Sequence, residues 1–67
     1  SSEERARWQY AMRDVLEGLR RRDTHCQQLS RDAAEEVDRV RLHDKASAYA
    51  HAAEMLAQAI DDASTDG

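Results

Sequence analysis

The stretch LHDKASAYAHAAEMLAQAIDDA, residues 42–63, decides the fold. Apolar side chains recur along it at alternating spacings of four and three residues, which is the repeat of an amphipathic α-helix. The repeat consists of Leu42, Ala46, Tyr49, Ala53, Leu56, Ile60 and Ala63. Because every position of the repeat is apolar, the stretch is predicted to form one helix.

This predicted helix is apolar around most of its circumference. Its polar side chains occupy a wedge of about 100°, and roughly 220° is left to apolar groups, many of them alanine. One neighbouring helix cannot cover so broad a surface. Two hairpins packed together as four helices would cover it, with Met55 at the edge of the contact.

A second apolar stripe precedes residue 42 and predicts a long first helix. The stripe stays within about one quadrant of a helix, and Arg22 alone interrupts it. The helix is predicted to begin near Glu3, with the hydroxyl of Ser2 as its N-cap. The stripe consists of Trp8, Met12, Val15, Leu19, Cys26, Leu29, Ala33, Val37 and Val40.

The chain must reverse between the two stripes, because on one continuous helix they would point to nearly opposite sides. We place the reversal between Glu35 and Asp44, and the second helix over about residues 42–63. No Gly or Pro marks the turn, and Asp38 or Asp44 is the candidate N-cap of the second helix. The predicted fold is therefore all-α, an antiparallel helical hairpin.

An alternative break lies near residues 23–24. Thr24 and Gln27 have the spacing of a capping box, which would divide the first helix and give a three-helix bundle. In either arrangement residues 1–67 form a single helical domain, with frayed ends at residues 1–2 and 64–67.

The composition indicates a small domain that associates with other chains. The 67 residues suffice for one domain and include no Pro, no Phe and two Gly. Cys26 is the lone cysteine and cannot form an internal disulfide, so we expect it to be a small buried apolar side chain. Because so thin a core leaves little stability to spare, we expect self-association, as a dimer or higher, into a helical bundle or coiled coil.

The contact with a second copy or a partner is expected to use the larger side chains of both stripes. Burial removes their apolar surface from water, which favours association. The predicted interface residues are Trp8, Met12, Val15, Leu19, Tyr49, Ala53, Met55, Leu56 and Ile60.

No catalytic, cofactor-binding or metal-binding arrangement is recognised. His25 and Cys26 are adjacent on a helix and point about 100° apart, so they cannot act together as base and nucleophile. His51 and Glu54 have helical spacing, but a structural metal site needs four ligands, and His51 lies in the polar wedge. We therefore expect no enzyme activity, no cofactor and no metal.

Charge is distributed unequally along the chain. Residues 1–31 contain seven Arg against five acidic residues, whereas residues 32–67 contain three basic against nine acidic residues. A basic row on the first helix could lie along a phosphate backbone, which makes a small nucleic-acid-associated regulator the alternative function. The candidate contacts are Arg13, Arg20, Arg21, Arg22 and Arg31. Because the chain is acidic overall, with a net charge of −4, nucleic acid is not the expected partner.

The function expected from the sequence is a non-enzymatic helical protein–protein interaction module. Such a module would bind itself and an unidentified macromolecular protein partner. Nine Arg against one Lys and many Ala suggest a GC-rich bacterial or phage genome, and the expected class is a small regulator or inhibitor. With no long apolar run and no N-terminal signal-peptide pattern, we expect a cytoplasmic location away from membranes.

Overall fold

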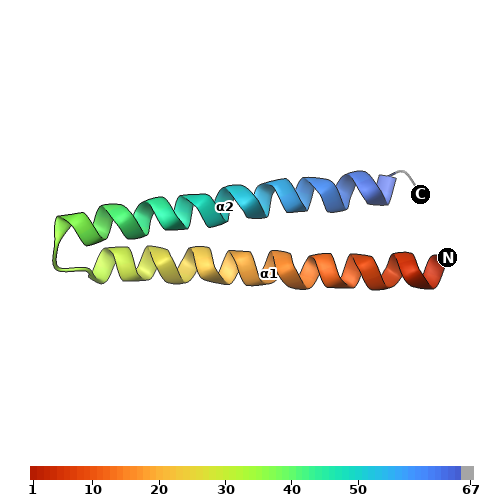
Figure 1. Ribbon diagram of the computed structural model, residues 1–67, viewed down its shortest axis with the longest axis horizontal. Helices are drawn as coiled ribbons and strands as arrows, with labels where there is room; N and C mark the ends of the chain where they lie inside the picture. Colours follow the sequence, from red (N-terminus) through yellow and green to blue (C-terminus); the bar gives the residue numbers. More distant parts are fainter. Residues whose placement is uncertain (66–67) are drawn as a thin grey trace.

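The computed structural model describes residues 1–65 and shows two long helices joined by a short turn (Figure 1). Helix α1 spans Ser2–Asp32 and helix α2 spans Glu36–Thr65. They run antiparallel, so the beginning of α1 lies beside the end of α2, and the Cα atoms extend 52 Å along the hairpin. The predicted all-α antiparallel hairpin is confirmed.

A capping box begins α1. The Ser1 hydroxyl accepts a hydrogen bond from the backbone N–H of Glu4 at 3.3 Å, and the Glu4 carboxylate reaches back to the Ser1 nitrogen at 3.4 Å. The predicted N-cap, Ser2, is one residue too late. A box on Ser2 would place Arg5 at the third helical position, and a guanidinium cannot accept the hydrogen bond that a carboxylate accepts.

Helix α1 continues without interruption through residues 23–24. The Thr24 hydroxyl donates to the carbonyl of Arg20 at 3.1 Å, and the Gln27 amide donates to the Asp23 carboxylate at 2.7 Å. Both contacts join residues four apart on one helix, so Thr24 bonds backward into α1 rather than capping a new helix. The alternative three-helix bundle is therefore wrong.

The turn lies earlier than predicted, at residues 33–35. Ala33 ends α1 with extended backbone angles, φ −67° and ψ 133°, and α2 begins at Glu36 rather than near residue 42. Val37 and Val40, which were assigned to the first stripe, belong to α2 and are exposed. Their apolar character continued the phase of the first stripe by coincidence, which moved the predicted reversal toward the C-terminus.

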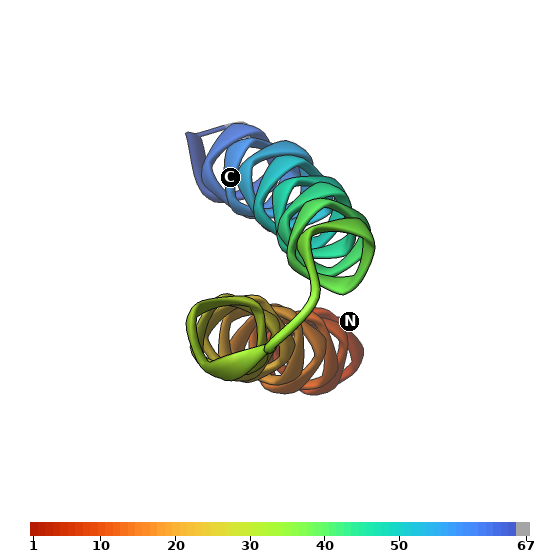
Figure 2. The same ribbon diagram turned by 90° about the vertical axis from the view of Figure 1, so that its left-hand side faces the viewer.

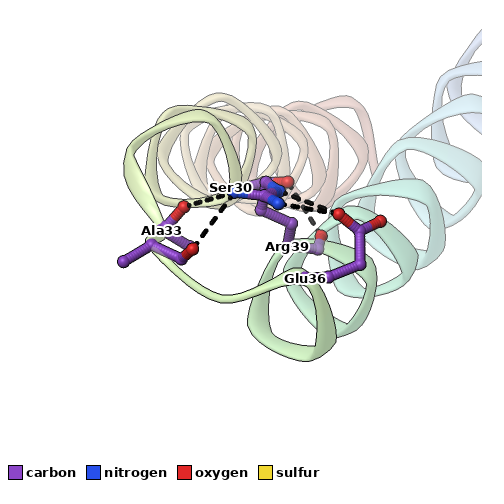
Figure 3. A network of polar contacts seen from close by, with 5 residues as sticks. Ser30, Ala33, Glu36 and Arg39 are labelled. Carbon is purple, nitrogen blue, oxygen red and sulfur yellow. Dashed lines mark hydrogen bonds and ion pairs between the residues drawn. The ribbon is translucent and has the colours of Figure 1, made fainter.

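Arg39 holds the turn together (Figure 3). Its guanidinium donates to the carbonyls of Ala33 and Ala34 at 3.0 and 3.4 Å, and to the Glu36 carboxylate at 3.2 and 2.8 Å. The backbone carbonyl of Arg39 accepts a hydrogen bond from the Ser30 hydroxyl at 2.8 Å. One side chain thus satisfies the carbonyls left free at the end of α1, a role that glycine often performs through the backbone.

Each helix packs against the other along one row of side chains. We call the two rows together the inner seam. Its buried and half-buried positions alternate three and four residues apart on both helices, the repeat of a coiled coil. Seen end-on, the helices lean in opposite directions, as they do when coiled around each other (Figure 2). The inner seam comprises Gln9, Met12, Leu16, Leu19, Asp23, Cys26, Ser30 and Ala33 on α1 and Arg39, Leu42, Ala46, Tyr49, Ala53, Leu56 and Ile60 on α2.

The two halves of the inner seam differ in apolar content. Toward the chain ends, Leu16, Ala53 and Ile60 form a buried cluster, against which Met12 and Leu56 pack with their neighbours. Toward the turn the seam holds Leu42 and Tyr49 but is otherwise made of small or polar side chains such as Asp23, Cys26, Ser30 and Ala46. Apolar burial therefore stabilises the half that holds the chain ends, and hydrogen bonds of Arg39 stabilise the turn.

Leu16→Ala is expected to destabilise the hairpin by about 2–3 kcal/mol, because it removes the largest buried side chain of α1 and leaves a cavity. Leu29→Ala is the matched control, since Leu29 is 41% exposed and should cost less than half as much. Urea unfolding followed by circular dichroism measures both. Equal losses from the two substitutions would contradict the assignment of the inner seam.

Arg39→Lys is expected to destabilise the hairpin by about 1 kcal/mol, because an ammonium cannot bind two carbonyls and a carboxylate in the fork geometry of a guanidinium. The control Arg21→Lys changes an exposed side chain away from the turn and should be nearly neutral. Thermal melts compare the two variants. A neutral Arg39→Lys would show that the turn does not need the guanidinium.

Candidate interaction surface

One side of the hairpin carries a row of apolar residues that lies directly beside the inner seam. Each residue of the row precedes an inner-seam residue by one, so it is rotated from the seam by about 100°. Because the helices are antiparallel, the rows of α1 and α2 lie on the same side of the hairpin. We call this side the apolar face, and it comprises Trp8, Ala11, Val15, Gly18, Ala48, Ala52, Met55 and Ala59.

Large side chains of the apolar face are open to solvent. Trp8 is 69% exposed, Val15 55% and Met55 62%. Trp8 also lines a shallow surface hollow together with Met12 and with Ala63 of α2, which places the tryptophan beside the end of the second helix. A contiguous exposed surface of this kind is typical of a contact that the isolated chain does not complete.

The apolar face becomes basic toward the turn. The Arg22 guanidinium lies over the Tyr49 ring, 5.9 Å from its centre, and marks the border. Beyond it the same rows hold His25 and Leu29 on α1 and Lys45 on α2. The cation–aromatic contact ties Arg22 to α2 and leaves its guanidinium at the surface.

The opposite side of the hairpin is a charged groove. Its residues follow the inner seam by one position instead of preceding it. Near the chain ends Arg20 shares the groove with Glu54 and Asp61, and near the turn Arg31 shares it with His43. Ala50 and Ala57, which are half-buried, line the groove together with these charged groups. The groove side also exposes Tyr10 and Val40, so the two sides differ mainly in the charged groups that line the groove.

The arginines considered for nucleic acid are all exposed but do not form one row. Arg13, Arg20 and Arg31 follow the charged groove, Arg22 borders the apolar face, and Arg21 points away from both. The carboxylates of Glu54 and Asp61 line the same groove as Arg20. Negative charges close to an arginine weaken the positive potential that a phosphate would meet.

The predicted interface residues divide into two groups. Met12, Leu19, Tyr49, Ala53, Leu56 and Ile60 lie on the inner seam, between the helices of one chain. Only Trp8, Val15 and Met55 face outward and remain available to a second chain. Leu16 was missed, although its spacing of four from Met12 and three from Leu19 continues the same repeat.

Other candidate chemistry finds no support within residues 1–65. Cys26 is a buried free thiol, as expected, and His51 and Glu54 are exposed. No three His, Cys, Asp or Glu side chains of this part of the chain are grouped so that they could bind a metal. Neither α1 nor α2 has an apolar stretch that could span a membrane. No protein-family model, curated protein or solved structure matches the chain.

We expect no complex between micromolar protein and duplex DNA at 150 mM salt, because Glu54 and Asp61 counter Arg20. An electrophoretic mobility shift measures this. The combined variant Glu54→Gln and Asp61→Asn should increase binding at low salt. A complex of the parent protein at 150 mM salt, lost when Arg20, Arg21 and Arg22 become Gln while helicity is kept, would contradict the expectation.

Proposed function

We propose that this chain is a non-enzymatic helical protein–protein interaction module that self-associates through its apolar face. The proposal rests chiefly on the exposure of Trp8, Val15 and Met55 on one side of the hairpin. A second copy presenting the same face would cover these side chains and complete a four-helix bundle.

The energy available on the apolar face is of the size that association requires. Burial of Trp8, Val15 and Met55 on two copies removes six large side chains from water, at ~2 kcal/mol each, or on the order of 10 kcal/mol in total. Loss of translational and rotational freedom costs roughly 4 to 15 kcal/mol. The gain and the cost are of similar size, so the strength of association depends on how well the side chains of the two copies fit together.

Charge supports the apolar face as the contact and the groove as the outer surface. A bundle joined through the groove would bury Arg20, Glu54 and Asp61, and each buried charge without ideal pairing opposes association. Left outside the bundle, the groove is the surface that we assign to a macromolecular protein partner whose charged side chains pair with those of the groove. A small bacterial or phage regulator or inhibitor would use its surfaces in this way.

Sedimentation equilibrium between 10 and 300 µM should show a concentration-dependent dimer. Met55→Glu should weaken association at least tenfold, because it places a charge on the apolar face. His51→Glu is the matched control on the exposed polar side of α2 and should leave association unchanged. A protein that remains monomeric throughout this range would refute the proposed self-association.

A further inference from the structure

Gly18 has no explanation within the hairpin. It lies in the middle of α1, where glycine weakens a helix relative to alanine. No glycine among the described residues has a positive φ, and a Cβ added to Gly18 would meet nothing within 4 Å. Neither backbone conformation nor a close neighbour in the same chain therefore requires glycine at this position.

Gly18 belongs to a second coiled-coil repeat on α1, which we call the outer seam. Its apolar members alternate in size, and charged residues of opposite sign extend the repeat at either end. Glu4 is largely exposed, and Arg22 is exposed as well. The outer seam comprises Glu4, Trp8, Ala11, Val15, Gly18 and Arg22, at spacings of four, three, four, three and four residues. This repeat can receive another helix in the way that the inner seam receives α2.

We propose that the outer seam binds the outer seam of a second copy, antiparallel, with each Trp8 packed over the partner's Gly18. In this register Val15 lies opposite the partner's Ala11, and Glu4 lies opposite the partner's Arg22. The inference rests on the proposed function and names the helix, the register and the contacts of that self-association. It also explains Gly18, because only a residue without a side chain leaves room for an indole between two close helices.

Complementarity of size and charge favours this register. Every apolar layer pairs a larger with a smaller side chain, and both ends of the seam pair an acid with a base. The two-fold symmetry of the dimer repeats each contact, so one pairing of Trp8 with Gly18 implies the second.

Other registers of the same seam fit less well. A parallel dimer would stack Trp8 on Trp8, leave a gap between two glycines at Gly18, and set Arg22 against Arg22. An antiparallel dimer shifted by one heptad would place Trp8 against the partner's His25 and Ala11 beneath the partner's Arg22. Only the proposed register combines large with small residues and keeps the charged residues paired.

The inference is tested by variants that exchange the large and the small side chain between positions 8 and 18. Gly18→Leu should weaken dimerisation at least tenfold, because leucine occupies the place of the partner's indole. Trp8→Ala should weaken it by a similar factor. The double variant Trp8→Ala/Gly18→Leu again pairs large with small and should recover to within about threefold of the parent dissociation constant. Gln28→Leu, which places the same leucine side chain at an exposed position of α1 away from the seam, is the control and should have no effect.

Sedimentation equilibrium of these variants separates the inference from the proposed function. If Gly18→Leu dimerises as tightly as the parent, or if the double variant is weaker than both single variants, the register is wrong although the chain still self-associates. If the parent protein is a monomer at 300 µM, both the register and the proposed self-association are wrong. Circular dichroism checks that each variant remains helical.

Orientation is measured independently by electron–electron double resonance. In a Cys26→Ser background, nitroxides attached at position 37, where Val37 is exposed beside the turn, should lie about 60 Å apart, since the turns point away from each other. A distance below about 30 Å would mean that the turns lie at the same end of the dimer and would overturn the antiparallel register.

Discussion

The structure depends on the burial of a single row of side chains between two helices. A two-helix hairpin has one internal contact, so each helix can shield only the residues that face the other. Leu16, Ala53 and Ile60 occupy that contact, whereas Trp8 and Met55 lie one residue before inner-seam positions and remain exposed. Apolar residues in excess of one row must therefore face solvent or another chain, and this geometric limit produces the apolar face.

The turn shows how a chain reversal is specified without Gly or Pro. Arg39 binds the carbonyls at the end of α1 and, through its own carbonyl, the hydroxyl of Ser30. These contacts join the two helices directly beside the turn, and they set which residues of α2 lie opposite which residues of α1. The register is thus held by directional hydrogen bonds where the seam is small and polar, and by apolar packing at the other end.

Sequence periodicity predicted α2 better than α1 for a physical reason. From Leu42 to Ile60 the apolar repeat and the buried row coincide, so the phase of the helix could be read directly. On α1 the predicted stripe combined two neighbouring rows, since Met12 belongs to the inner seam and Trp8 to the apolar face. The average direction of the stripe therefore lies between the two rows. Leu16, the most buried leucine, falls outside the stripe. Arg39 and Gly18 were not predicted as important, because the first acts through geometry and the second through the absence of a side chain.

The different character of the two sides bears on how far the proposed assembly can grow. A chain with apolar rows on both sides of its hairpin would accept a neighbour on each and extend into a fibre. Here the second side exposes Tyr10 and Val40, but its groove is lined by Arg20, Glu54 and Asp61. These charged groups are costly to desolvate, so this side does not offer an equivalent contact. In the proposed dimer, the single self-complementary seam on α1 gives each copy one partner. Closure of the proposed dimer would therefore follow from the same one-residue offset that separates the inner seam from the outer seam.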